Sequence, residues 1–191
     1  MVDTVYHHDV VYTAQSARAL GVPQHKLIHL CEKKVVVPDV RDARGRGSSR
    51  EFSKRNLFDF AIAVEMRRLE LPVSFVQAVL RVLRSFEREV RASLTDFSLP
   101  DSLLATNAPR LMLVILDGER LYFRLTSNNQ SRLFGGVAIH HPRARGRARQ
   151  HQSIGHPQPA EIERALDAAR TRTDVDLSRI ARDLEDRLSA A

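Results

Sequence analysis

The sequence of 191 residues contains a single cysteine, Cys31. One thiol excludes an intramolecular disulfide and any zinc site built on several thiolates, and it suits a reducing compartment. No apolar run approaches the roughly 20 residues that a membrane-spanning helix needs. The first residues, MVDTVYHHDV, lack the basic and apolar regions of a signal peptide. We therefore expect a cytoplasmic protein without a membrane partner.

No arrangement of residues typical of catalysis stands out. No serine, cysteine or carboxylate constellation suggests an active site, so we expect no enzyme activity, no catalytic residue and no cofactor. His25 and His29 have metal-compatible spacing on a predicted helix, but no third ligand is evident. The histidine pairs at 7–8 and 140–141 are adjacent, and neighbouring side chains on a strand point apart. We therefore expect no metal site.

Positive charge is in excess. The sequence has 30 Lys and Arg residues against 23 Asp and Glu residues, a formal net charge of +7. This balance favours a polyanionic partner, although it also fits a basic protein that its charge keeps soluble. Residues 143–159 contain four arginines and no acidic residue, whereas residues 160–191 are acidic. The run from Arg143 to Arg149 is either a solvated linker or a clamp on a phosphate backbone.

Two short helices with a tight turn between them are predicted near the N-terminus. Thr13 is a good N-cap for a helix over residues 14–20 that ends at Gly21, and Pro23 begins a second helix that runs to about Lys33. The second helix has a buried face made of Leu27, Leu30 and Cys31, and an outer face that carries Gln24, His25, Lys26 and His29. Such a pair of helices has the shape of a helix-turn-helix.

A basic hairpin is predicted next. Residues 35–38 (Val-Val-Val-Pro) form a short strand, and residues 40–52 form a glycine-rich tip and a return strand. The arginines of this hairpin are Arg41, Arg44, Arg46 and Arg50. Two helices follow, one capped by Ser53 and running to Leu69, the other running from Pro72 to about Arg91. The first of these packs through Leu57, Phe58, Ala61, Val64, Met66 and Leu69.

The C-terminal half has a different pattern. Two or three antiparallel strands are predicted within residues 111–139, because Asp117-Gly118 is a strong hairpin signal. Residues 160–191 predict an amphipathic helix or helix pair, which Thr173-Asp174 would break. Its apolar stripe is equally compatible with a seam between two chains and with local core. The stripe consists of Leu177, Ile180, Leu184 and Leu188. The expected fold class is α+β, mainly α.

The order of helix, helix, arginine-rich hairpin, helix and helix resembles the N-terminal domain of the MerR family of transcriptional regulators. The resemblance covers about residues 11–84. It is carried by Tyr12-Thr13, Ala17, Leu20-Gly21-Val22, Leu27, Val35-Val36, Pro38, Arg50-Glu51-Phe52-Ser53, Leu69-Glu70-Leu71-Pro72-Val73 and Val79-Leu80. The second helix departs from the family, because the arginine and tyrosines of its usual Leu-Arg-Tyr-Tyr-Glu run are missing. That part of the usual DNA contact is not carried over.

The sequence thus predicts four segments, of which the resemblance supports the first. These are a MerR-like winged helix-turn-helix DNA-binding domain over residues 1–92, a small antiparallel β-hairpin module over 93–141, a flexible basic linker over 142–159 and a C-terminal amphipathic helix over 160–191. The outer face of the second helix would contact base edges in the major groove, and the hairpin and the start of the third helix would contact phosphate or the minor groove. The predicted DNA-binding residues are Thr13, Gln24, His25, Lys26, His29, Arg41, Arg44, Arg46, Arg50, Ser53, Lys54 and Arg55.

The function implied is sequence-specific binding of double-stranded DNA for transcriptional control, by a homodimer on a near-palindromic site. RNA polymerase is a further candidate partner, the nucleoid is the expected location, and no effector ligand is indicated. Two alternatives stay open. MerR-like folds also occur in chaperone modulators, which are adaptors that bind proteins and not DNA. A phage or recombination accessory protein that bends DNA is the other alternative.

Overall fold

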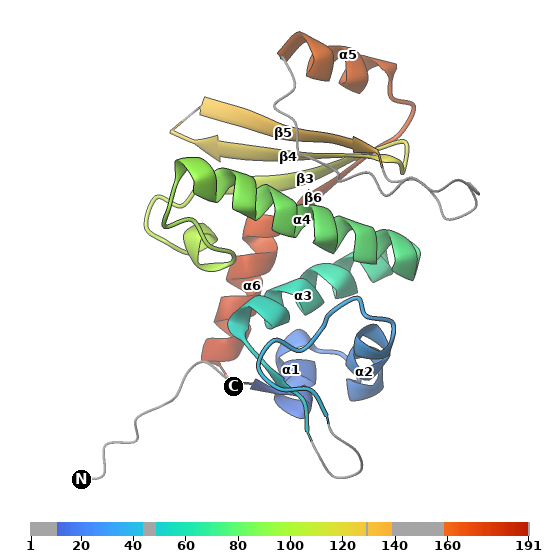
Figure 1. The fold of residues 1–191 in the computed structure, drawn as a ribbon, viewed down its shortest axis with the longest axis vertical. Coiled ribbons are helices and arrows are strands. Elements are labelled where there is room, and N and C mark those ends of the chain that lie inside the picture. Colours follow the sequence, from blue (N-terminus) through green and yellow to red (C-terminus); the bar gives the residue numbers. More distant parts are fainter. Residues whose placement is uncertain (1–10, 44–48, 129, 139–158, 191) are drawn as a thin grey trace.

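The computed structural model describes residues 11–43, 49–128, 130–138 and 159–190. Helices and an antiparallel sheet make up an α+β fold, as expected from the sequence (Figure 1). The elements in chain order are β1 (Val11–Tyr12), α1 (Thr13–Leu20), α2 (Gln24–Glu32), β2 (Glu51–Phe52), α3 (Lys54–Arg68), α4 (Val73–Ser93), the 3₁₀ helix η1 (Asp101–Leu103), β3 (Arg110–Leu116), β4 (Arg120–Ser127), β5 (Gln130–Ala138), α5 (Pro159–Ala168), β6 (Arg172–Asp176) and α6 (Leu177–Ser189).

The first two helices follow the sequence closely. Helix α1 ends at Gly21, whose φ of 62° is accessible to glycine without strain, and Pro23 precedes α2. The expected cap is one residue off, because Tyr12 is the N-cap and Thr13 is already helical. The predicted buried face of α2 is confirmed, since Leu27, Leu30 and Cys31 are all buried.

The predicted strand over residues 35–38 is wrong. The backbone N–H of Val35 donates to the carbonyl of Leu30 at 2.9 Å, which closes the end of α2, and Val35 and Val36 are buried without strand pairing. The return strand β2 pairs instead with β1, where Val11 lies opposite Phe52. Residue Arg41 adds one antiparallel bridge to Glu51. The hairpin tip, residues 44–48, lies outside the described residues.

Helices α3 and α4 are confirmed. The Ser53 hydroxyl accepts a hydrogen bond from the backbone N–H of Asn56 at 3.2 Å and so caps α3. Helix α3 is buried on most sides, with Phe58 and Phe60 fully inaccessible. Leu69, predicted to pack, is 49% exposed because α3 ends there and the chain turns away at Glu70, whose φ is 60°.

The sheet has the strand order β5-β4-β3-β6, and all neighbouring strands are antiparallel. The strands β3, β4 and β5 confirm the prediction for residues 111–139. Strand β6 was not predicted: the expected helix break at Thr173-Asp174 is a strand, in which Val175 lies opposite Leu113 of β3. The C-terminal segment is therefore helix, strand and helix.

Helices cover both faces of this sheet (Figure 1). Side chains alternate between the two faces of a strand, so Leu113 and Val114 of β3 enter different apolar clusters. On one face, the ring of Phe86 from α4 stacks on Phe123 with centroids 4.7 Å apart. On the other face, Ile162 of α5 packs in the cluster that contains Val114.

Helix α6 joins the sheet to the N-terminal helices. It follows β6 directly and packs against β3, α3 and α1 (Figure 1). Leu177 and Leu184 are buried in one core with Leu20 of α1 and Leu113 of β3. Of the two alternatives for the C-terminal leucine stripe, the structure shows local core. In the described ranges, no helix combines the length and apolar character needed to cross a membrane.

Candidate nucleic-acid interface

Helix α2 presents a polar face to solvent. Its opposite side is anchored by Leu27 and Leu30, and the left-handed turn at Gly21 sets its direction relative to α1. The exposed side chains of α2 are the four predicted from the sequence, Gln24, His25, Lys26 and His29, together with Glu32 at its end. Within the part of the chain that the structure describes, none of the four predicted side chains has a hydrogen bond or an ion pair. Their donors and acceptors are therefore free for a partner.

A groove of about 500 Å³ runs beside this face, between α2 and the C-terminal end of α3. Nitrogen-bearing side chains from both helices line it: His25, Lys26, His29, Arg67 and Arg68. Its base is apolar and includes Val22, Leu30, Val64 and Val73. No carboxylate is among its described lining residues. The groove therefore favours an anionic group over a cationic one.

The described arginines of the hairpin lie at its base. Arg41 pairs with Glu51 across the β-bridge, and its side chain remains 59% exposed. Arg50 Nε lies 3.0 Å from Asp42 Oδ1. Arg44 and Arg46 lie outside the described residues. The described pairs hold the two sides of the hairpin together and leave Arg41 open to solvent.

The hairpin base lies close to α2. The charges of Arg50 and Asp42 both act on the Cys31 thiol of α2. Burial is the larger effect and raises the pKa of Cys31 to about 11. The thiol is thus protonated at neutral pH, which confirms the interpretation of Cys31 as a small buried apolar side chain.

The start of α3 is occupied by groups of the chain itself. One Asp39 carboxylate oxygen accepts the backbone N–H of Ser53 at 3.0 Å, and the other accepts its hydroxyl. Lys54 Nζ lies 2.9 Å from Glu185 Oε2 and 3.3 Å from Asp101 Oδ1. Burial acts to lower the pKa of Lys54, but the hydrogen bonds to these carboxylates outweigh it and raise the pKa. An outside phosphate would have to compete with three carboxylates here.

Arg55 also lies in an internal network, one that the sequence did not reveal. Asp59 is 0% exposed, and its two oxygens lie 3.3 Å from Arg55 Nε and 3.0 Å from Arg84 Nη2. Arg55 pairs with Glu87 of α4 as well. Burial raises the pKa of Asp59, and the two arginines oppose that shift. The one signal available was an aspartate inside the apolar run Leu57-Phe58-Asp59-Phe60.

Thr13, also among the predicted contact residues, is only 6% exposed. Its side chain packs within the helical part of the chain and is not accessible to a partner. The structure thus groups α2 with the base of the hairpin, whereas Thr13 is buried and Lys54 and Arg55 are engaged with carboxylates of the chain.

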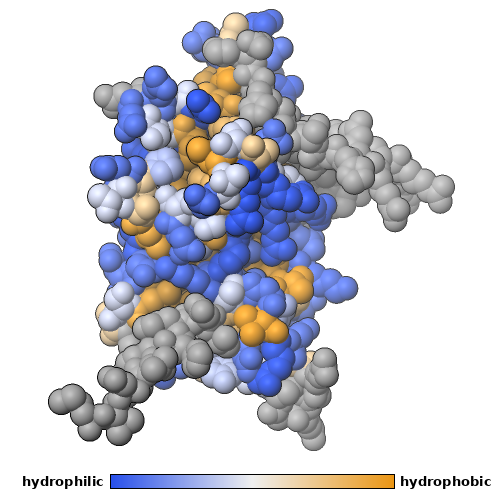
Figure 2. Space-filling model, turned by 60° about the vertical axis from the view of Figure 1, so that its left-hand side comes forward, coloured by the Kyte–Doolittle hydropathy of each residue, from blue (hydrophilic) through white to orange (hydrophobic). Residues whose placement is uncertain are grey.

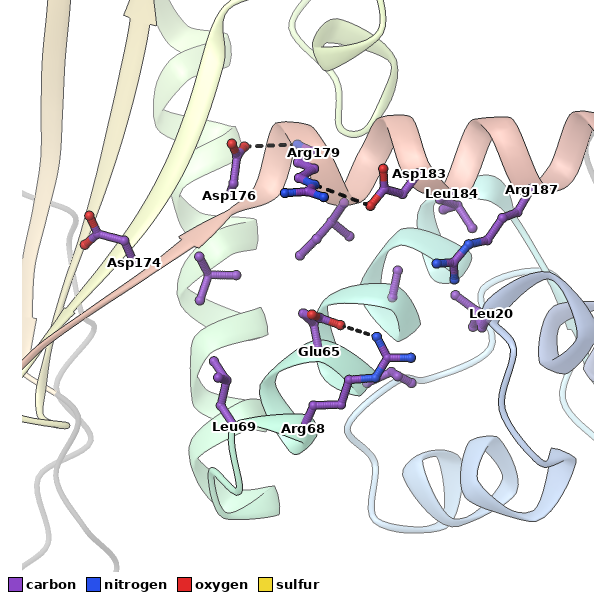
Figure 3. Close-up of a pocket in the computed structure, with 14 residues that line it drawn as sticks. Leu20, Glu65, Arg68, Leu69, Asp174, Asp176, Arg179, Asp183, Leu184 and Arg187 are labelled. Atoms are coloured by element: carbon purple, nitrogen blue, oxygen red, sulfur yellow. Dashed lines mark hydrogen bonds and ion pairs between the residues drawn. The ribbon is translucent and has the colours of Figure 1, made fainter.

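A second pocket, of about 420 Å³, lies between α1, α3, β6 and α6 (Figure 3). Leu20 and Leu184 supply apolar surface, and charged residues surround them. The charges are largely paired inside the chain: Glu65 with Arg68 at 2.8 Å, and Arg179 with Asp183 at 3.8 Å (Figure 3). This mixed lining gives no preference for an anion, unlike the groove beside α2.

Within the described ranges, no group of three His, Cys, Asp or Glu side chains is placed to hold a metal ion. On the face shown in Figure 2, hydrophilic surface separates the hydrophobic surface into several patches. No protein-family model and no curated protein matches this sequence.

Proposed function

We propose that the protein is a sequence-specific DNA-binding transcriptional regulator of the MerR-like winged helix-turn-helix type, with α2 as its recognition helix. The observation that carries the proposal is the outer face of α2, where four polar side chains are exposed and unengaged within the described structure. Gln pairs well with adenine and Lys with guanine, and His offers a donor or an acceptor.

The dimensions of α2 suit the major groove. Helix α2 has nine residues, with its apolar side buried in the core and its polar side exposed. An α-helix with its side chains is about 10–12 Å wide, and the major groove is about 12 Å wide. Insertion of α2 would bring the cation-lined groove beside it close to the phosphates that border the major groove.

Phosphate contacts come from the hairpin in this proposal. Arg41 is exposed, and Arg44 and Arg46 at the tip are included on the basis of their sequence pattern. The net charge of +7 supports a polyanionic partner. We leave out Thr13 because it is buried, and Lys54 and Arg55 because they are engaged with carboxylates. No catalytic residue or cofactor is required.

A homodimer on a near-palindromic site belongs to the same proposal, because a single short recognition helix buries little DNA surface. Leu177 and Leu184 belong to the core, so the seam between protomers would lie elsewhere. RNA polymerase as a partner and the nucleoid as location follow from a role in transcription.

The test compares α2 variants on two labelled duplexes, one selected by the full-length protein and one of random sequence. A base contact contributes about 1–3 kcal/mol of discrimination. Q24A/K26A should therefore bind the selected duplex at least five-fold more weakly than wild type in fluorescence anisotropy, with a smaller loss on random DNA. R164A, which removes an exposed charge from α5, serves as control. Equal affinity of wild type and Q24A/K26A for the selected duplex would refute the role of α2.

A further inference from the structure

A row of cationic side chains follows one face of α4. Gln77, Arg81, Arg84, Arg88 and Arg91 are separated by four, three, four and three residues, which keeps them on one stripe of a helix. All four arginines are exposed, whereas the opposite face of α4 is buried against α3 and the sheet. The ten residue steps from Arg81 to Arg91 correspond to about 15 Å of helix.

The row begins where α2 ends. Gln77 Nε2 donates a hydrogen bond of 3.0 Å to the carbonyl oxygen of Lys34, which lies two residues beyond α2. Lys33 and Lys34 are exposed at this junction. From there α4 runs from the side of the molecule that carries α2 to the opposite side (Figure 1). The positive surface of the α2 region is thus continued by the stripe on α4.

One carboxylate from α3 and one from α4 itself hold two of these arginines in place. Asp59, which is fully buried, lies 3.0 Å from Arg84, and Glu87 lies 3.5 Å from Arg91. Both arginine side chains remain about half exposed, at 49% and 50%. Arg91 Nε also donates to the carbonyl oxygen of Phe97 at 2.6 Å, but a guanidinium has five N–H donors, so both arginines keep donors for a partner. Such positioned guanidinium groups are well suited to phosphate oxygens.

The other two arginines carry charge that no carboxylate among the described residues compensates. Arg81 and Arg88 have no ion pair among the residues that the structure describes, and Arg88 donates only to the Ser85 hydroxyl at 2.9 Å. The stripe therefore combines two fixed cations with two open ones. A regular polyanion complements such a row, and about 15 Å matches roughly four nucleotides of one DNA strand at 3.4 Å each.

We propose that this stripe, together with Lys34, is a second contact track for the phosphate backbone of the duplex that α2 reads. It extends the contacted DNA beyond the α2 site. The inference rests on the proposed function, since it presupposes that the partner is double-stranded DNA. It adds a surface that reads no bases and strengthens binding to longer duplexes.

The experiment measures affinity by fluorescence anisotropy at several salt concentrations, on a selected duplex trimmed to the α2 site and on the same site extended by ten base pairs at each end. R81A/R88A should bind the extended duplex more weakly than wild type, and the slope of log affinity against log salt should flatten by up to about 1.8, or 0.9 per lost contact. Affinity for the trimmed duplex should stay within two-fold of wild type. R81K/R88K, which keeps both charges, should restore most of the binding.

The matched control is R164A/R170A, which removes the same charge from exposed positions at α5, on the other face of the sheet (Figure 1). Equal loss of affinity and slope in the control and in R81A/R88A would overturn the track, because only net charge would then matter. Wild-type behaviour of R81A/R88A on the extended duplex, with Q24A/K26A still impaired, would overturn the track and leave the proposed function standing. If wild type binds no duplex but binds single-stranded RNA through Arg81 and Arg88, the assignment to duplex DNA fails.

Discussion

Asp59 is a buried carboxylate at the contact between α3 and α4. It lies in the middle of α3 between two buried phenylalanines, and its carboxylate is inaccessible to water. Arg55 and Arg84 provide the opposite charges, at 3.3 Å and 3.0 Å. Removing Asp59 would take away these two charge-assisted hydrogen bonds, while Arg55 keeps Glu87 and Arg84 is half exposed, so we expect a cost of about 1.5–3 kcal/mol. The link from α3 to Arg84 of α4 therefore depends on this single carboxylate.

Replacing Asp59 by alanine should consequently lower the free energy of unfolding by about 1.5–3 kcal/mol, measured by urea denaturation followed by circular dichroism. Asp96, which is exposed, provides the control: D96A should stay within about 0.5 kcal/mol of wild type. Similar stabilities of D59A and D96A would mean that the buried network contributes little.

The pH dependence of stability tests the same residue separately. The pKa of Asp59 is raised by burial, so its neutral form is favoured in the folded state. The stability that this provides is complete below the unfolded pKa, about 3.9, and is lost as the pH rises through the folded pKa. Wild type should therefore lose stability relative to D59N as the pH rises from 4 to 7. A gain of wild type over D59N in that range would show that the arginines prevail over burial.

At the scale of elements, β5 depends on the absence of a side chain at Gly135. Its φ is 129°, and a Cβ atom there would lie 2.5 Å from the carbonyl oxygen of Leu121. This position is next to the register shift between Leu121 and Tyr122, where β5 bulges against β4. The bulge therefore requires glycine both for backbone conformation and for space.

We expect Gly135→Ala to destabilise the protein by more than the about 1–3 kcal/mol that backbone strain alone costs, because the added methyl group also meets the β4 backbone. Gly118 is the matched comparison, since it too has a positive φ, 65°, but open space around its Cβ position. G118A should cost only about 1–2 kcal/mol. Thermal or urea denaturation of both variants shows which one loses more stability. An equal loss of stability in G135A and G118A would contradict the packing argument.

The sequence predicted the elements that have a strong apolar repeat. It failed where the pattern of residues does not distinguish a valine buried in a turn from one paired in a strand. Helices α1 to α4 and strands β3 to β5 follow from apolar repeats, caps and turn residues. The valines at 35–37 have the composition of a strand, but Val35 and Val36 are buried by the turn that closes α2. Strand β6 has a single buried residue, Val175, so its five residues gave no readable repeat.

The candidate site, too, was predicted only in part. The outer face of α2 was predicted correctly, because helical spacing separates Lys26 from Leu27 and Leu30 without further information. The engagement of Lys54 and Arg55 could not be predicted, since Glu185 and Glu87 are distant in sequence. Net charge at a helix start does not reveal whether the fold itself supplies the counter-charge.

For the molecule as a whole, α6 determines whether the N-terminal helices and the sheet behave as one unit. Leu184 is 3% exposed and belongs to a core that contains residues of α1, α3 and β3. A stripe of leucines has the same sequence pattern whether it packs between two chains or inside one chain, so the sequence did not decide between these alternatives. The continuous core favours a single cooperative unfolding transition.

Leu184→Ala should therefore lower the free energy of unfolding by about 2–5 kcal/mol and affect both parts together. Hydrogen exchange measured by mass spectrometry should show loss of protection in α3 and in β3 by similar amounts. L94A, at a position 54% exposed, is the control and should change little. Loss of protection in α3 with an unchanged β3 would indicate two separable modules.

The central claim is that α2 reads DNA sequence, and selection from a pool of random duplexes tests it most directly. Full-length wild type should enrich a motif with two related half-sites about one helical turn apart, and Q24A/K26A should enrich it poorly or not at all. A wild-type pool that stays random after repeated rounds, at a salt concentration where non-specific binding is weak, would contradict the account.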